Sequence, residues 1–449
     1  MILLCIRLPI KPLQAKIVPR IPMSVITIFK EICKIPHCSY EAENLKKYIL
    51  EKAQFYGYEV QTDKVGNILC SHPEAELILQ SHYDMVCIGK APELELYEEE
   101  GHLKAKESSL GADNGIGMAM MLSLMQEKQK ISCLFTSDEE VGLIGAQGLA
   151  LEIKEKWMLN LDTEEEGYVY IGCAGGADVI AKKSLHRQEI REEVSSYEVL
   201  VDGLAGGHSG IDIDKNIPSA IKVLSAFLVH IPHYLISIEG GERRNSIPRS
   251  AKAIISVPTG VIVDSDLENI GITKLKKTET QMIQDGHKVT EMIHAFAQGV
   301  RAVNTELNII QSSINLALIE TNENEVKVSL SARSMDSEEL LVLVNETVCF
   351  FKAFDFMASS EGMYPAWKPE VNDFSLKVQT ICKKHFKDAS FKAIHAGLEC
   401  AILKQHSPHL DIVSIGPNIY NPHSSRESVE IASVERVFTA LKEIVKECS

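Results

Sequence analysis

The chain has 449 residues, of which 45% are hydrophobic and 24% are charged, and its formal net charge is −16. This length predicts two or three domains with sizeable buried cores, and the composition is typical of an ordinary soluble protein. The negative charge argues against nucleic acid and against an anionic membrane surface as partners, and no apolar run reaches transmembrane length.

Residues 1–22 differ in character from the rest of the chain. Arg7 interrupts their apolar run, prolines follow, and no small-residue cleavage site is present. A signal peptide is therefore not expected. We interpret this stretch as a tail that is either disordered or the product of a start upstream of Met23.

The 11 cysteines are scattered along the chain without a CxxC pair. Several of them, such as Cys70, Cys133 and Cys173, fall within apolar strand-like segments. This pattern predicts reduced, buried thiols in a cytoplasmic protein rather than a disulfide framework.

Residues 23–185 alternate between helix and strand patterns. Helical spacing covers 24–33 and 40–56, and further helices are expected after Gly115 and Ile144. Short apolar strands are expected between them, at 58–60, 67–71, 77–79, 131–135 and 157–161. This alternation predicts an α/β fold, with a mostly parallel sheet and helices on both faces.

Polar side chains follow the apolar strand at 77–79 in a pattern that suits a metal. His82 and Asp84 come after the strand at 77–79, and residues two apart on an extended chain point to the same side. His82 could then ligate a metal while Asp84 holds its other ring nitrogen, although a capped strand end would look the same. Asp113, in the glycine-rich run LGADNGIG, is either a helix cap or a carboxylate that bridges two metals.

More acids and a second histidine follow other strands. Glu139 and Glu140 come after 131–135, Asp162 comes after 157–161, and His423 follows a distant apolar strand at 412–415. Alone, each is an ordinary acidic turn or loop histidine. In open α/β sheets, however, ligands bind beyond the carboxyl ends of strands. One histidine with carboxylates, repeated twice, suits a pair of zinc-like ions with positions open to water and substrate.

Near residue 186 the pattern changes to alternating apolar and polar residues, which predicts antiparallel strands with one solvated face. Helical stretches separate these strands, and one of them is expected at 266–270. The run YPAWKP at 364–369 is expected to be a stiff return linker. We therefore predict a discontinuous catalytic domain (23–185 and 371–449) with an inserted α+β lid or dimerisation domain (186–370).

Several segments together resemble a known family, the co-catalytic zinc metallopeptidases that include glutamate carboxypeptidases, aminoacylases and carnosinases. Within it, the chain is most similar to the aminoacyl-histidine (Xaa-His, or cytosol non-specific) dipeptidase branch. The likeness runs from about residue 24 to the C-terminus. It rests on QSHYDMVC, LGADNGIG, FTSDEEVG, NLDTEEEG, GGHSG, RNSIPR, YPAWKP, IHAGLEC and VSIGP followed by PH.

The resemblance implies a complete set of metal ligands. His82 and Asp162 would hold one divalent ion, Glu140 and His423 the other, and Asp113 would bridge both. Zn²⁺ is the expected metal, and Mn²⁺ or Co²⁺ also accept this mixed donor set. The family more often has Gly where Ser81 stands and Leu where Tyr83 stands, which leaves the exact substrate preference open.

The resemblance also implies roles for side chains around the metals. Glu139 would be the general base, and Asp84 would orient His82. In the inserted domain, His208 would stabilise the oxyanion. His395, in the IHAGLEC segment, is interpreted equally well as a structural residue. The residues expected to position the substrate are Asn245, Arg333 (on the free carboxylate), Gly397 with Leu398 (on the pocket wall), and Glu399 (sensing the amino end).

The activity expected from this set is metal-dependent hydrolysis of dipeptides, Xaa-His among them, by a cytoplasmic enzyme. The alternatives are an N-acyl amino acid amidohydrolase or related carboxypeptidase with the same metals, and a metal-binding protein without turnover. We expect dipeptides as the partners, with no nucleic acid or membrane, and a homodimer. His208 would act either on a partner subunit's site or within its own chain.

Overall fold

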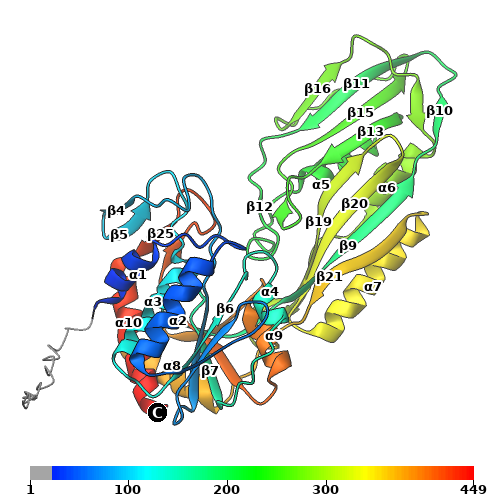
Figure 1. Cartoon of the computed structure of the whole chain (residues 1–449). Helices are drawn as coiled ribbons and strands as arrows, with labels where there is room; N and C mark the ends of the chain where they lie inside the picture. The colour runs from blue at the N-terminus through cyan, green and yellow to red at the C-terminus, as the bar shows by residue number, and fades with distance from the viewer. Residues whose placement is uncertain (1–22, 449) are drawn as a thin grey trace, which may run out of the picture.

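The computed structural model describes residues 23–448, so the tail predicted for residues 1–22 lies outside the described range. The chain forms two lobes, each built on its own large sheet (Figure 1). An eight-stranded sheet organises the first lobe and a nine-stranded sheet organises the second. None of the helices in residues 23–448 combines the length and the apolar character that a membrane span requires.

The central strands of the first sheet run parallel to one another, so their carboxyl ends meet at one edge. β3 is buried along its whole length, as expected for a parallel strand covered on both faces. Antiparallel pairs occur toward the edges. The strand order is β1 (Glu59–Thr62), β2 (Ile68–Ser71), β6 (Ser132–Thr136), β3 (Leu77–His82), β7 (Trp157–Asn160), β23 (Asp411–Ser414), β8 (Tyr168–Cys173) and β22 (Ser390–Ile394).

Helices cover both faces of this sheet, as predicted. One face packs against α1 (Val25–Ile32), α2 (Glu43–Tyr56), α3 (Ala112–Gln126), α8 (Asp373–His385) and α10 (Ile431–Glu447). The other face carries α4 (Ile144–Gln147) and α9 (Glu399–His406). α3 is apolar on all sides because α1, α10 and the sheet surround it. Gly115 is required there, since a Cβ would lie 2.6 Å from the ring of Phe29.

The second lobe is an antiparallel sheet whose covered face packs on three helices in one hydrophobic core. The helices are α5 (Ala220–Leu228), α6 (Gly286–Ala295) and α7 (Ser337–Ala353). The strand order is β16 (Ile270–Lys274), β11 (Val194–Val201), β15 (Ala251–Pro258), β13 (Tyr234–Gly240), β19 (Ile309–Thr321), β20 (Glu325–Ser334), β9 (Gly175–Ser184) and β21 (Met357–Tyr364), with β18 (Gly299–Asn304) paired to β19.

Three small sheets complete the structure. A pair of short strands, β12 (Gly207–His208) and β14 (Ser246–Ile247), lies at the junction of the lobes. The others are the pair β10 (Arg187–Glu189) and β17 (Gln281–Ile283), and a four-stranded sheet of β24 (Ile419–Tyr420), β25 (Ser428–Glu430), β5 (His102–Ala105) and β4 (Leu96–Glu99).

Two sequence-based expectations differ from this structure. The boundary expected after residue 185 falls at the end of β9, although β9 belongs to the second sheet, where it pairs with β20 and β21. An apolar strand carries no mark of which sheet it will join, so the pattern could not separate β9 from β8. The helix expected at 266–270 is absent from the described structure, because Ile270 instead pairs with Val201 at the start of β16.

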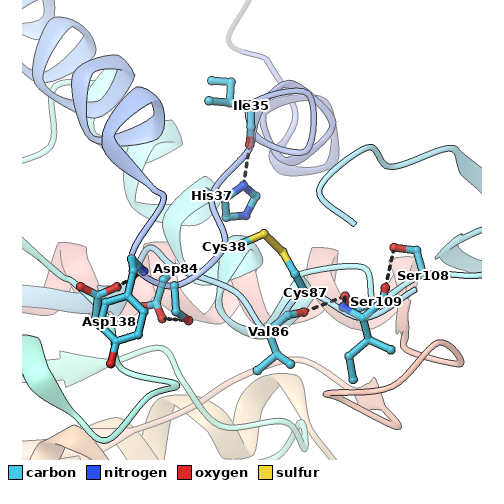
Figure 2. Close-up of a disulfide and its surroundings, with 12 residues drawn as sticks. Ile35, His37, Cys38, Asp84, Val86, Cys87, Ser108, Ser109 and Asp138 are labelled. Carbon is cyan, nitrogen blue, oxygen red and sulfur yellow. Dashed lines mark hydrogen bonds between the residues drawn. A yellow bond between two sulfur atoms is a disulfide. The ribbon is translucent and has the colours of Figure 1, made fainter. Parts of the chain in front are cut away.

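The prediction of wholly reduced cysteines is wrong for one pair, Cys38 and Cys87, which form a disulfide (Figure 2). These residues lie 49 positions apart, and no spacing rule links them. They meet because a bridge between Cys38 and Met85 lays the two segments side by side. Eight other cysteines are free among the described residues, and all but Cys349 are buried.

Candidate metal centre

The parallel strands deliver the predicted ligands to one edge of the first sheet. His82 ends β3, Glu140 follows β6 and Asp162 follows β7. Asp113 stands in the first turn of α3, and His423 lies in the loop between β24 and β25. All five side chains line one cavity. The arrangement matches the general placement of ligand sites beyond the carboxyl ends of strands.

Two groups of potential ligands share the carboxylate of Asp113. In the first group, His82 Nε2 lies 3.2 Å from Asp113 Oδ1 and 3.3 Å from Asp162 Oδ1. In the second, His423 Nε2 lies 3.1 Å from Asp113 Oδ2 and 2.8 Å from Glu140 Oε1. The two oxygens of Asp113 therefore face different histidines, which is the geometry of a bridging ligand.

The donor set fits a pair of divalent cations. Three carboxylates and two imidazoles converge, and within residues 23–448 no lysine or arginine forms an ion pair with these carboxylates. Glu140 Oε1 is buried and accepts no hydrogen bond, despite its short distance to His423. Mixed nitrogen and oxygen donors of this kind suit zinc, manganese or cobalt.

Asp84 anchors the side of the centre away from the cavity. His82 Nδ1 lies 3.0 Å from the backbone carbonyl of Asp84, its hydrogen-bond partner, and 3.5 Å from Asp84 Oδ1. The Asp84 carboxylate accepts hydrogen bonds from the backbone N–H groups of Glu139 (2.9 Å) and Glu140 (3.4 Å). Burial alone would raise the pKa of Asp84, but the bonds from His82 and from Ser39 outweigh it and lower this pKa. Asp84 therefore stays ionised and fixes both a ligand and the acidic turn.

Glu139 faces the same cavity as the metal ligands. Burial raises its pKa well above the ordinary value, and the charges of Asp162 and Glu140 add to this effect while His82 opposes it. A carboxylate with a raised pKa beside a metal centre is suited to take and return a proton. Glu139 forms a further candidate ligand group with His82 and Glu140, but it belongs to neither of the two groups that share Asp113.

Two residues that support the centre were not predicted from the sequence. The carboxylate of Glu427 is buried and accepts hydrogen bonds from four successive backbone N–H groups, those of residues 110–113. Asn114 donates from Nδ2 to the carbonyl of Leu161 and to the Asp162 carboxylate. Glu427 follows His423 by four residues, which is the one signal that could have indicated it. Nothing in the sequence relates Asn114 to Asp162.

A cavity of about 1590 Å³ lies between the lobes and brings residues of the inserted domain to the metal centre. His208, Asn245 and Arg333 line it from the second lobe, and Gly397 with Leu398 lines it from the first. The expected set is thus assembled within a single chain. Glu399 is the exception among the residues predicted to position the substrate.

The structure places Glu399 beneath the metal centre rather than on the cavity wall. Its side chain is fully buried, and its Oε2 accepts hydrogen bonds of 2.6 Å from both Gln80 and Thr136. Its other oxygen, Oε1, has no partner among the described residues. A buried carboxylate in this position acts on the packing of β3 and β6, so direct contact with a substrate's amino end is not supported.

His208 is held in one tautomer by its own loop. Its Nδ1 accepts from the backbone N–H groups of Gly210 and Ile211, both at 3.2 Å. Burial, followed by the charge of Arg333, lowers the pKa of His208 to about 4. The ring is therefore neutral near pH 7, and its remaining proton is on Nε2, which makes that atom a hydrogen-bond donor.

Arg333 offers an unused donor beside the cavity. Its side chain is 7% exposed, its Nη1 donates to the Tyr364 hydroxyl at 3.1 Å, and its Nε has no hydrogen-bond partner among the described residues. A buried guanidinium with a free donor is a natural receptor for a carboxylate. His395 lies nearby, where its Nε2 is 2.7 Å from Ser313 Oγ, and this contact favours the structural interpretation of His395.

Comparison with known proteins identifies the family of this chain. The model of peptidase family M20/M25/M40 matches residues 78–447. The chain is 31% identical to the cytosol non-specific dipeptidase of Escherichia coli strain K12, over 95% of this chain and 98% of that protein. It resembles the structure of aminoacylhistidine dipeptidase from Vibrio alginolyticus with a TM-score of 0.81 and 28% identity, over 97% and 98% of the two chains.

A more distant structure shows the same fold. A tripeptidase from Staphylococcus aureus matches with a TM-score of 0.58 and 18% identity, over 94% of this chain and 97% of the other. The family match and the dipeptidase relatives cover nearly the whole described chain, both lobes included. The chain therefore belongs to peptidase family M20/M25/M40 and is a peptide-bond hydrolase.

Proposed function

We propose that this enzyme is a metal-dependent dipeptidase of broad specificity that cleaves Xaa-His dipeptides among others. The observation that carries the proposal is the pair of ligand groups that share Asp113, beside the raised-pKa carboxylate of Glu139. Relatives of this chain are named as a cytosol non-specific dipeptidase and an aminoacylhistidine dipeptidase, which supports the substrate class.

The metals would be held by His82 with Asp162, by Glu140 with His423, and by Asp113 between them. When bound, two divalent cations supply Lewis-acid activation of water and of the scissile carbonyl. Zn²⁺ is the proposed metal, since nitrogen and carboxylate donors suit it, and Mn²⁺ and Co²⁺ are the alternatives.

The chain's own residues carry the proton transfers. Glu139 accepts a proton from the attacking water and later delivers it to the leaving amine nitrogen. His208, neutral and protonated on Nε2, donates a hydrogen bond to the oxygen that becomes negative as water adds. Asp84 keeps His82 and the Glu139 backbone in place throughout.

The two ends of a dipeptide find different partners in the cavity. Arg333 would bind the free carboxylate through its guanidinium group, and Asn245 lines the same cavity. Glu164 also lines the cavity and would favour a free amino group. An N-acyl amino acid has the same carboxylate but lacks the amino group, so the alternative amidohydrolase activity uses only one of these two contacts.

The setting proposed for the enzyme is a cytoplasmic homodimer. The Escherichia coli relative is named as a cytosolic protein, which supports the location. Exposed apolar side chains occur on α7 and on the edge strand β21, which supports association through that edge. They are Leu341, Val342, Met357 and Met363. Light scattering on the purified protein measures the solution mass and tests the dimer.

Replacement of Glu139 by Gln tests the function. The variant should keep its bound metal, since Glu139 is outside the two ligand groups that share Asp113, while kcat for dipeptides falls by about 10²–10⁴-fold or more. Glu152→Gln, at an exposed position in the same lobe, is the control and should retain full activity. Normal turnover by Glu139→Gln would overturn the role of the base. A panel of dipeptides beside N-acetyl amino acids separates the two activities.

A further inference from the structure

The Cys38–Cys87 disulfide lies beside the residues that hold the metal centre (Figure 2). Cys38 stands in the loop between α1 and α2, and Cys87 stands three residues after Asp84. Around the bond, Met85 donates its N–H to the carbonyl of His37, and Ser39 donates its N–H to the carbonyl of Met85. The disulfide therefore adds a covalent bond between two segments that already pair through these two hydrogen bonds.

The segment that carries Cys38 contacts Asp84 directly. Ser39, next to Cys38, donates its hydroxyl to Asp84 Oδ2 at 2.7 Å. Asp84 contacts His82 Nδ1 through its backbone carbonyl at 3.0 Å and through Oδ1 at 3.5 Å, and its carboxylate accepts from the N–H of Glu139. Asp84 is 1% exposed, so each of its few bonds counts in fixing its orientation. Ser39 is thus positioned to act on a metal ligand and on the base through one carboxylate.

The segment that carries Cys87 is connected to the segment of the bridging ligand, Asp113. Ser109 donates its hydroxyl to the carbonyl of Val86 at 2.7 Å (Figure 2) and accepts from the N–H of Ile88 at 3.0 Å. Ser109 is therefore hydrogen-bonded to both chain neighbours of Cys87. Ser109 is four residues before Asp113 in the chain. The loop carrying Cys87 is therefore tied to the segment that presents Asp113, as well as to Asp84.

We propose that Cys38 and Cys87 form a reversible thiol–disulfide site, and that the oxidised pair holds Ser39 against Asp84 and thereby strengthens metal binding. The inference rests on the metal centre of the proposed function and not on the identity of its substrate. Reduction would free the loop that carries Ser39, Asp84 would lose a hydrogen bond, and His82 would be less firmly oriented. Loss of such outer contacts weakens metal affinity by about 10- to 100-fold.

The chemistry of the switch is thiol–disulfide exchange with a small dithiol or a small disulfide. Both cysteines are half-buried, so a small reagent can reach the bond. One thiolate of the dithiol attacks one Sγ, forms a mixed disulfide and releases the other Sγ. The second thiolate then closes the dithiol into a ring. The two electrons reduce the protein bond, and the two protons of the dithiol end on Cys38 and Cys87.

A purely structural crosslink is the competing explanation, and metal affinity distinguishes the two. We would measure the Zn²⁺ dissociation constant by chelator competition, with the protein first oxidised by a small disulfide and then reduced by a dithiol. Alkylation with mass spectrometry reports the state of each thiol. Reduction should weaken Zn²⁺ binding about tenfold or more, and re-oxidation should restore it.

Three variants sharpen the test. The double variant, Cys38→Ser with Cys87→Ser, should bind Zn²⁺ as weakly as the reduced enzyme. Its Zn²⁺ affinity should not change when the reductant is added. Ser39→Ala, with its disulfide intact, should weaken Zn²⁺ binding in the same direction, an effect that a plain crosslink would not predict. Cys349→Ser removes an exposed, unpaired thiol in the second lobe and should respond to the reductant like the parent enzyme.

Two results would overturn the proposal. One is a Zn²⁺ dissociation constant that stays within about twofold on reduction while thermal stability falls, which is the behaviour of a structural crosslink. The other is alkylation of both cysteines after treatment with the small disulfide, which would mean that the bond does not form. Neither readout uses a peptide substrate, so a failure of the dipeptidase assignment would be seen separately in the Glu139→Gln assay.

Discussion

The carboxylate of Glu427 accepts a hydrogen bond from the backbone N–H of Asp113 at 3.4 Å, although the two residues are 314 positions apart. The same carboxylate accepts closer bonds from Leu110 at 2.7 Å and Ala112 at 2.8 Å. A negative group at the start of a helix is favourable because the first N–H groups have no partner within the helix. The last segment of the chain thus fixes the turn that presents the bridging ligand.

We expect Glu427→Gln to weaken both the fold and the metal centre. Glutamine has a single acceptor oxygen, and its amide group would face N–H donors. Leaving these donors unsatisfied should lower the free energy of unfolding by about 1–3 kcal/mol. Zn²⁺ affinity should fall about 10- to 100-fold.

Urea unfolding and chelator competition measure these two effects. Glu427→Asp, which keeps the charge, should recover part of the affinity, and the exposed Glu435→Gln on α10 is the control. Unchanged Zn²⁺ affinity in Glu427→Gln would mean that the turn does not need this carboxylate.

Glu399 should tolerate Gln but not Ala. In Glu399→Gln, the amide oxygen can still accept from Gln80 and Thr136, while the amide NH₂ takes the place of the unpartnered Oε1. Glu399→Ala removes an acceptor from both buried donors. Gln80 then keeps only its bond to Thr136 Oγ1 (3.0 Å), and Thr136 keeps only a longer bond to the Ser81 carbonyl (3.4 Å), so the variant should cost about 1–3 kcal/mol of unfolding free energy. Measured kcat/KM for dipeptides should be nearly unchanged in Glu399→Gln. A large rise in KM in this variant would instead restore the amino-end role expected from the sequence.

The metal ligands could be predicted from the sequence because their rule is local. His82 ends a short apolar strand, Glu140 and Asp162 follow two others, and parallel strands end at the same edge of a sheet. These three ligands therefore meet wherever the α/β pattern holds. The same periodicities predicted the mostly parallel sheet, the helices on both of its faces and the inserted lobe. The family resemblance supplied the role of each site residue.

The supporting contacts could not be predicted in this way because they depend on tertiary packing. Glu427 reaches the turn before α3 from the far end of the chain, and Cys38 meets Cys87 only after two loops pair. Glu399 lies one residue after Leu398, which lines the cavity, yet its own side chain points into the core. The motif predicted which part of the structure Glu399 occupies, but not which way its side chain points.

Arg333 should set the preference for a free carboxylate. Arg333→Met removes the unpaired Nε donor, and transition-state binding of dipeptides should fall by about 1.5–3 kcal/mol, measured as kcat/KM. A dipeptide with an amidated C-terminus should suffer a similar loss with the parent enzyme. The variant should no longer distinguish acid from amide. If it keeps the same discrimination, another group binds the carboxylate.

His208 should act within its own chain, because it lines the same cavity as Glu139 in a single copy of the protein. Mixing Glu139→Gln subunits with His208→Ala subunits tests this arrangement. If His208 served the partner's site, half of the sites in a mixed dimer would regain both groups and activity would return. We expect no recovery after unfolding and refolding the mixture. Appreciable restored turnover would instead indicate that subunits share the site.

His395 should make the metal-free protein less stable in acid. Burial, followed by the charges of Arg333 and His208, lowers its pKa from 6.5 to about 3. Between these values the unfolded chain binds a proton that the folded chain does not, so stability falls as the pH falls through this window. The contribution of one such group is at most about 1.4 kcal/mol per pH unit.

The His395→Gln variant should therefore show a shallower loss of stability between pH 6 and pH 4, judged by urea unfolding in the presence of a chelator. Glutamine can keep a hydrogen bond to Ser313, so packing changes should be small. His409→Gln, at an exposed position, is the matched control. Parallel stability curves for His395→Gln and the parent protein would show that this imidazole takes up its proton equally in both states.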